Sequence, residues 1–371
     1  FLGHYHTETY KLMGGKFLSV DAHYYLKDLE IMENLSPLDA IGYAAFISDR
    51  GDCFLYLVFQ YLVSLLVGGG SPGFVGLTMP AILIVLFSLA SFAFVRATKA
   101  DLPYASIAAL LAAVGFVTTV GLYAGFYANW FALIQIYAFL ALLIATLRKF
   151  RLWTAVLAVL TSVAVLYTHP WSWMILMAIL TGYVLAILAV FKVRRLNVEN
   201  PSYELKLLAF VFAVNAAMFL VRDWLGIGSG AAVIDLERQG IHLSLLNILK
   251  ADINFNSSFK WIVGGFYGYP PIYLLALLGI TRLLNPKDHY SRFLLIWLIV
   301  TSLMVFTDVH TSVWSRFIYL APLHLYTASS IYTLKLEDRK FWLYLFCVLI
   351  SLLLLNYSLR SIVVKQFGPL G

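Results

Sequence analysis

Long apolar stretches separated by short polar turns dominate the pattern of the chain. A helix needs about 20 mostly apolar residues to cross a bilayer. The pattern therefore predicts an all-α, polytopic membrane protein with about ten transmembrane helices. These helices are expected at residues 76–95, 104–121, 129–147, 152–167, 171–191, 205–222, 268–284, 293–307, 316–334 and 341–357.

One further apolar run, Cys53–Val67, is only fifteen residues long, which is less than the roughly 20 residues that a crossing helix needs. We interpret it as a buried or re-entrant helix, and a complete crossing is the alternative. The polar opening of the chain leads into an amphipathic segment, Ala22–Asn34, and the run Cys53–Val67 comes after this segment. We therefore predict that residues 1–75 form a first loop with amphipathic and re-entrant helices. Residues 76–371 would then form the transmembrane domain, with a long loop at 223–267.

Composition agrees with a membrane location. The chain is 61% apolar and only 12% charged, whereas a soluble domain carries roughly 25% charged residues. Its two cysteines, Cys53 and Cys347, lie in separate apolar segments without metal-ligand spacing, which predicts free thiols and no metal site. Because the chain begins at Phe1 without a Met, we expect an eleventh span to precede it.

The positions of the basic residues predict the orientation. Loops that follow every second span hold fifteen of the 26 Lys and Arg residues, and these loops mark the cytoplasmic side. The net charge of +7 is therefore a topology signal, which argues against a nucleic-acid partner. In this arrangement the first loop, the turn before Asn129, the turn at His169 and the loop 223–267 all face the outer side.

Polar residues placed at the outer ends of apolar helices are candidates for a functional site, because they are costly near hydrocarbon. Asp21 is the candidate catalytic residue. The candidate substrate-binding residues are His23, Asp49, Arg50, Tyr127, Asn129, His169, Arg222, Tyr269, His310 and Arg316.

Structural roles are the alternatives for several of these residues. Asp21 precedes a helical segment and is a candidate N-cap. The sequence SDRGD at 48–52 is compatible with a turn that carries a surface ion pair. His169 lies among aromatic residues, as in an interfacial belt. Arg222 has an acidic neighbour, Asp223, with which it can pair as the helix ends.

Arg316 is the most informative of the basic candidates. It begins a predicted span on the side where short loops otherwise lack positive charge. A snorkelling side chain is the alternative explanation. However, a cation at a helix N-terminus is unfavourable unless an anion lies nearby. Arg316 and the helix N-terminus together would make a good phosphate site.

Several stretches resemble the GT-C superfamily of membrane glycosyltransferases, which use polyprenyl-phosphate or polyprenyl-pyrophosphate sugars. The first loop, with SVDAHYYLKDLEIMENL, is similar to the acidic first loop of that superfamily. The stretch that begins ADLPYASIAALL resembles the following spans of oligosaccharyltransferase catalytic subunits, and SRFIYLAPLHL resembles a later span. The resemblance implies that Asp21 is a catalytic acidic residue and that Arg316 binds the lipid phosphate.

The chain departs from the oligosaccharyltransferase pattern in two places. Where a second acidic motif would fall, it has Ala128, Asn129 and Trp130. It also lacks the W-W-D-Y-G sequence and a C-terminal soluble domain. These departures argue against sequon-directed transfer to protein, and they place a divalent metal cofactor in doubt. The resemblance is closer to the metal-independent lipid-phosphate-sugar transferases.

The sequence thus predicts an integral membrane glycosyltransferase of a prokaryotic plasma membrane or of the endoplasmic reticulum, with an extracytoplasmic active site. Its partners would be a polyprenyl-phosphate-sugar donor, membrane lipids and an acceptor that carries a hydroxyl group. Asp21 would act as general base in an inverting transfer. The alternative is a flippase or a non-catalytic protein that binds a lipid-linked sugar. The missing carboxylates favour it, whereas the lack of an internal repeat and of interrupted helices argues against a transporter.

Overall fold

The computed structural model describes residues 21–67, 72–98, 100–193, 201–228, 270–283, 288–303, 319–333, 344 and 347–352. All regular elements in these ranges are helices. Five of them are long and apolar enough to cross a membrane: Pro72–Ala97, Leu102–Leu122, Tyr127–Arg148, Pro170–Ala189 and Ser202–Trp224. These helices make the chain an integral membrane protein, as the hydrophobic pattern predicts.

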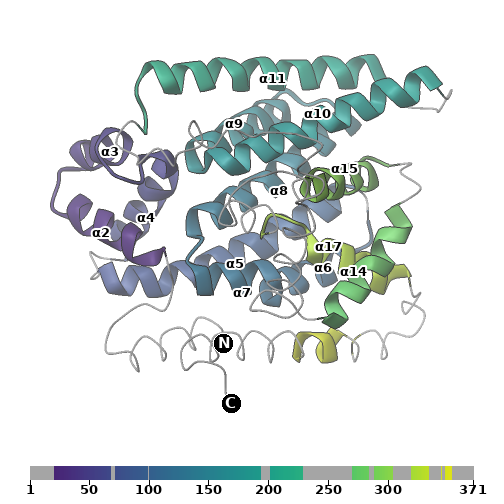
Figure 1. The fold of residues 1–371 in the computed structure, drawn as a ribbon, viewed down its shortest axis with the longest axis horizontal. Coiled ribbons are helices and arrows are strands. Elements are labelled where there is room, and N and C mark those ends of the chain that lie inside the picture. Colours follow the sequence, from purple (N-terminus) through teal and green to yellow (C-terminus); the bar gives the residue numbers. More distant parts are fainter. Residues whose placement is uncertain are drawn as a thin grey trace, which may run out of the picture.

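The first loop folds into a compact group of short helices. These are α2 (Ala22–Glu33), α3 (Pro37–Phe46), the 3-10 turn η1 (Gly51–Cys53) and α4 (Phe54–Leu66). Ser36 caps α3 by accepting a hydrogen bond from the backbone N–H of Asp39. In Figure 1 this purple group gathers at the left end of the bundle. The first loop is therefore positioned beside the ends of the long helices.

The centre of the bundle is α8 (Tyr127–Arg148), which packs between α5 (Pro72–Ala97) and α9 (Leu152–Thr168). Most of the side chains of α8 are buried, including Trp130 and Tyr137. A helix with apolar residues on all sides is expected at such a position.

The predicted span at 104–121 is interrupted at Gly115. It consists of α6 (Leu102–Val114) and α7 (Phe116–Ala124). A Cβ atom at Gly115 would lie 2.3 Å from the carbonyl oxygen of Leu111, so only glycine fits this break. The stretch Leu102–Leu122, which contains both helices, is long and apolar enough to cross a membrane, so the span is confirmed. The break within it is not predicted by the sequence analysis.

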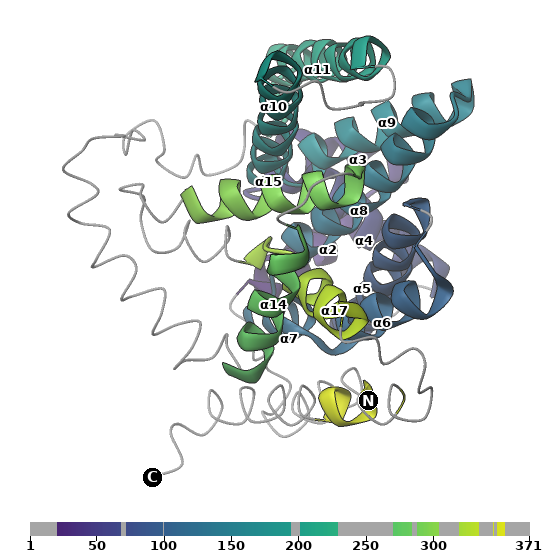
Figure 2. The same cartoon turned by 90° about the vertical axis from the view of Figure 1, so that its right-hand side faces the viewer.

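The remaining helices complete the bundle on two sides. In Figure 2, α10 (Pro170–Val193) and α11 (Pro201–Trp224) lie at the top, and α15 (His289–Leu303) lies below them. Beneath α15, α14 (Pro270–Leu283) and α17 (Leu323–Thr333) lie together.

The contact between α14 and α17 is especially close. At Gly279 a Cβ atom would lie 1.8 Å from the carbonyl oxygen of Tyr326. Any side chain at position 279 would therefore separate the two helices.

Half of the predicted spans are not confirmed by the described residues. The segment 152–167 forms α9, an apolar helix of 17 residues. Segments 268–284, 293–307 and 316–334 overlap α14, α15 and α17, which are helices of 14, 15 and 11 residues. Of 341–357, the structure describes only residue 344 and residues 347–352.

The run Cys53–Val67 forms α4, a helix of 13 residues. At 1.5 Å per residue its length is about 20 Å, which is less than the roughly 30 Å thickness of a hydrocarbon core. Our interpretation of this run as an incomplete crossing stays a prediction, and the length of α4 supports it.

Candidate functional site

The structure describes eight of the eleven candidate site residues. Arg316, Tyr269 and His310 lie outside the described residues. The described candidates come from three places: the first loop, the start of α8 with the end of α9, and the end of α11. They are Asp21, His23, Asp49, Arg50, Tyr127, Asn129, His169 and Arg222.

Asp21 and Arg50 form an ion pair within the first loop. Arg50 Nη2 lies 3.8 Å from Asp21 Oδ1, and both side chains are mostly buried. Asp21 stands at the N-cap position of α2, but its side chain makes no capping hydrogen bond. The sequence leaves catalysis and helix capping open for Asp21. The structure shows no capping hydrogen bond from this side chain, and the catalytic role stays a prediction.

Two tyrosine rings hold the guanidinium group of Arg50. Its Cζ atom lies 4.6 Å from the centroid of the Tyr24 ring and 5.7 Å from that of Tyr25. Arginine is attracted to aromatic faces at such distances. His23, which is exposed, packs on Tyr24 with 3.8 Å between the ring centroids. Asp49 is exposed beside this group, which we call the Arg50 cluster (Asp21, Tyr24, Tyr25 and Arg50).

A buried carboxylate anchors the backbone of the cluster. Asp28 accepts hydrogen bonds from the hydroxyl groups of Tyr43 and Ser48, each at 2.9 Å. Ser48 Oγ in turn accepts a hydrogen bond from the backbone N–H of Arg50 at 2.9 Å. Burial raises the pKa of Asp28 above its usual value, although the two hydroxyl donors act in the opposite direction.

Aromatic contacts connect the cluster with α8. The ring of Tyr25 packs edge-on against Tyr56 of α4 at 4.9 Å and stacks with Tyr127 at 6.3 Å. Tyr127 is the first residue of α8, so these contacts place the first loop at the end of the bundle where α8 begins.

Asn129 and His169 meet in a second polar group at the same end. Ser172 Oγ donates a hydrogen bond to Asn129 Oδ1 at 2.6 Å and lies 2.8 Å from His169 Nδ1. All three side chains are buried, and Asn129 Nδ2 has no hydrogen-bond partner among the described residues. His169 therefore contacts specific polar partners, and the sequence did not single out Ser172, which joins it to Asn129.

Arg222, near the end of α11, approaches the first loop from another side. The backbone N–H of Gly228 donates to the carbonyl oxygen of Ala45 at 2.7 Å, which ties the end of α11 to α3. Arg222 Nη2 lies beside Gly228, and Arg222 interacts electrostatically with Asp52. Arg222 Nε is buried, and no described residue accepts a hydrogen bond from it.

The described residues at this end do not form a divalent-metal site. Among them, no group of three or more His, Cys, Asp or Glu side chains could hold a metal. Asp21 already has the guanidinium of Arg50 beside it. Asn129, at the place of the second acidic motif, uses its Oδ1 atom to accept from Ser172.

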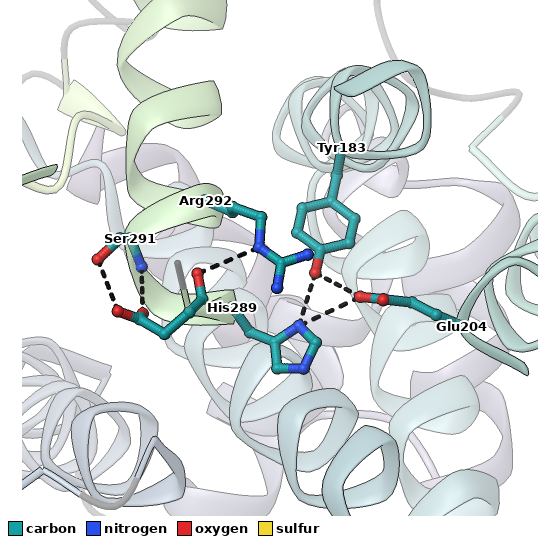
Figure 3. A network of polar contacts seen from close by, with 6 residues as sticks. Tyr183, Glu204, His289, Ser291 and Arg292 are labelled. Carbon is teal, nitrogen blue, oxygen red and sulfur yellow. Dashed lines mark hydrogen bonds and ion pairs between the residues drawn. The ribbon is translucent and has the colours of Figure 1, made fainter. Parts of the chain in front are cut away.

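A further polar network joins α10, α11 and α15, and sequence analysis missed it (Figure 3). Glu204 is buried and accepts a hydrogen bond from the hydroxyl of Tyr183, and it lies 3.1 Å from His289 Nδ1. The same nitrogen lies 2.7 Å from the Tyr183 hydroxyl, and Arg292 stands over the Tyr183 ring at 5.8 Å. We call these four residues the Glu204 network.

The Glu204 network lies at the end of the bundle opposite the Arg50 cluster. Tyr203, the neighbour of Glu204, donates to the carbonyl oxygen of Thr146 at 3.2 Å, and Thr146 stands in the last turn of α8. Asn129 stands in the first turn of α8. The 22 residues of α8 span about 33 Å. The network therefore belongs to the end that the basic loops predict to be cytoplasmic.

Fold and site together define a helical membrane protein with a polar cluster at one end of its bundle. No protein-family model matches the chain, and no curated protein matches it by sequence. Among solved structures, the chain is similar to the crystal structure of the Archaeoglobus fulgidus oligosaccharyltransferase in complex with Zn and sulfate. The TM-score is 0.51 and the sequence identity 16%.

This similarity covers 84% of the chain but only 44% of the archaeal protein. The chain therefore spans less than half of the length of that oligosaccharyltransferase. At this identity the match shows a shared fold, which agrees with the resemblance found in the sequence.

Proposed function

We propose that the chain is a membrane glycosyltransferase that takes its sugar from a polyprenyl-phosphate donor and transfers it, with inversion, to an acceptor hydroxyl on the outer face. The observation that carries this proposal is the fold likeness to an oligosaccharyltransferase. The Arg50 cluster supports it, because it holds an acidic residue beside the ends of the long helices.

In the proposed reaction, the acceptor oxygen attacks the anomeric carbon while the bond from that carbon to the phosphate oxygen breaks. Asp21 takes the proton of the acceptor hydroxyl, and the polyprenyl phosphate leaves with the electron pair. Positioned proton transfer of this kind typically contributes 10²–10⁴-fold to the rate.

Arg316 would bind the phosphate of the donor and stabilise the charge that develops on it. Two other arginines, Arg50 and Arg222, are among the candidate substrate-binding residues, and Arg222 fits the role of a second phosphate ligand better than Arg50. The guanidinium of Arg50 already pairs with Asp21 and packs on two tyrosine rings. In contrast, the Nε atom of Arg222 has no acceptor among the described residues.

The test uses purified protein in liposomes with radiolabelled polyprenyl-phosphate sugars and hydroxyl acceptors. We expect transfer of label to an acceptor, and the anomeric configuration of the product should be opposite to that of the donor. Donor binding without transfer to any acceptor would contradict the proposal.

The second candidate is a flippase or a non-catalytic protein that binds a lipid-linked sugar. The residues Ala128, Asn129 and Trp130, in place of a second acidic motif, favour it. Movement of a fluorescent donor between the two leaflets of protein-containing liposomes, without any transfer product, would support this alternative.

A further inference from the structure

The Arg50 cluster combines an acidic residue with a cation that the fold itself supplies. Donor oxygens from several residues are needed to bind a divalent metal, and the described residues around Asp21 do not provide them. The positive charge beside Asp21 is instead the guanidinium of Arg50. A divalent cation at Asp21 would be repelled by this group unless Arg50 moved away.

Arg50 is held in place from several directions. The rings of Tyr24 and Tyr25 contact its guanidinium group. Its backbone N–H donates to Ser48, whose hydroxyl donates to the buried carboxylate of Asp28. These contacts restrict both ends of the side chain.

The backbone after Arg50 is restricted as well. A Cβ atom at Gly51 would lie 3.2 Å from the Cα atom of Gly228 and 3.3 Å from the carbonyl oxygen of Ala44. The loop thus turns at Gly51 in a narrow space between α3 and Gly228, which restricts the backbone next to Arg50.

We propose that Arg50 is the fixed cation that holds Asp21 in place of a divalent metal, and that Asp28 and Ser48 are positioning residues that hold Arg50. The catalytic part of this inference rests on the proposed function, because that function makes Asp21 the general base. The physical arrangement itself can be tested separately.

The first test measures metal binding and does not depend on activity. Mn²⁺ binding to the purified protein is followed by electron paramagnetic resonance. We expect the wild-type protein and Asp21→Asn to give the same signal, because Arg50 excludes the ion from Asp21. A bound Mn²⁺ ion that disappears in Asp21→Asn would overturn the inference.

The second test measures the coupling of the cluster through the thermal stability of the protein in detergent. Asp21→Asn, Arg50→Gln and the double variant form one cycle, and Asp28→Asn with Arg50→Gln forms another. Contacting residues give non-additive effects, whereas independent sites give additive ones. Additive shifts in both cycles would contradict the proposal, whether or not the protein transfers a sugar.

The third test applies once transfer by the wild-type protein has been measured. Chelation of divalent metals should leave the rate unchanged. Ser48→Ala and Asp28→Asn should lower kcat, because a misplacement of about 1 Å can cost about 10²-fold, and the Kd of the donor should stay the same. Glu30→Gln, an exposed change on the same helix as Asp28, is the matched control and should match the wild type.

Two results would contradict the third expectation. One is loss of activity on chelation that a divalent metal restores. The other is an equal loss of donor binding and kcat in Ser48→Ala, which would indicate general damage to the loop. A wild-type protein without transfer activity would instead count against the proposed function, and the first two tests would still decide the role of Arg50.

Discussion

Tyr25 of the first loop stacks with Tyr127 at the start of α8, with 6.3 Å between the ring centroids. This contact joins a segment near the beginning of the chain to the central helix of the bundle. Because Tyr25 also packs on Arg50, the contact fixes where the Arg50 cluster lies relative to the long helices.

Asp21 and Arg316 should differ in what their removal changes. Asp21→Asn should lower turnover by about 10²–10⁴-fold and leave donor binding nearly intact, because it removes the base and little of the phosphate site. Arg316→Ala should weaken both donor binding and turnover, since its charge holds the phosphate in ground and transition states alike. In a flippase or scaffold, Asp21→Asn would change nothing in the same binding and transfer assays.

The orientation of the bundle can be checked by labelling single cysteines in sealed vesicles. Asp49 and Lys149 are both exposed, and they lie at opposite ends of the bundle. With Cys53 and Cys347 replaced by Ser, we expect a membrane-impermeant thiol reagent to label Asp49→Cys from the outside and Lys149→Cys only after the vesicles are opened. Labelling of both positions from one side would show that the predicted topology is wrong.

Ser172→Ala should destabilise the protein. The change removes the donor to Asn129 and the neighbour of His169 and leaves buried polar atoms without partners. Such atoms cost about 1–3 kcal/mol, which unfolding in denaturant should detect. Thr161→Ala is the matched control, because Thr161 is partly exposed and its hydroxyl donates to the carbonyl oxygen of Leu157 in its own helix. Equal stability of the two variants would argue against the Asn129–Ser172–His169 network.

Tyr183→Phe should lower the stability of the protein without affecting its binding of the polyprenyl-phosphate-sugar donor. Its hydroxyl donates to buried Glu204 and contacts His289, so we expect a loss of about 1–3 kcal/mol in the free energy of unfolding. Because the Glu204 network lies at the other end of the bundle, donor binding should stay at the wild-type value. Tyr332→Phe, which removes an exposed hydrogen bond to Asp101, is the control and should cost less. A change in donor affinity would link this network to the substrate site.

Asp28 should give the protein a specific dependence of stability on pH. Burial raises the pKa of Asp28 above its usual value of 3.8, Asp49 raises it further, and Lys27 and the hydroxyl donors lower it. At pH values between 3.8 and the raised pKa of the folded state, the folded protein binds the proton of the Asp28 carboxyl group more tightly than the unfolded chain does. Stability from this group therefore falls as pH rises through that window.

Asp28→Asn should remove this slope, which melting temperatures measured upward from about pH 4 would reveal. The curves of the wild type and the variant should diverge toward low pH in favour of the wild type. Parallel curves would show that Asp28 does not titrate differently in the folded state.

The long helices could be predicted because each is a continuous apolar run. The segment 129–147, for example, forms α8 at Tyr127–Arg148. The break at Gly115 could not be predicted in this way, since both flanking segments are apolar and a single glycine is compatible with either structure. Close backbone approach to Leu111 decides it, and that contact exists only in the folded chain.

The candidate site could be predicted in its residue types and in the shared location of some of them, but not in their pairing. The positions of the basic loops indicated that Asn129 and His169 belong to the same end of the bundle, and the structure brings them together through Ser172. The pairing of Asp21 with Arg50 and the anchoring by Asp28 depend on how three short helices pack. Sequence analysis gave no role to Glu204 or His289, because sequence spacing does not show that two polar side chains on separate helices face one another.

The close contact of α14 with α17 at Gly279 has a consequence for how the protein is made. Lipid tails are as apolar as most helix surfaces, so association inside a bilayer depends on close packing between helices. During synthesis α14 emerges well before α17, so Gly279 cannot meet Tyr326 until the later segment has been made. The close contact between these two helices therefore forms late in the assembly of the bundle.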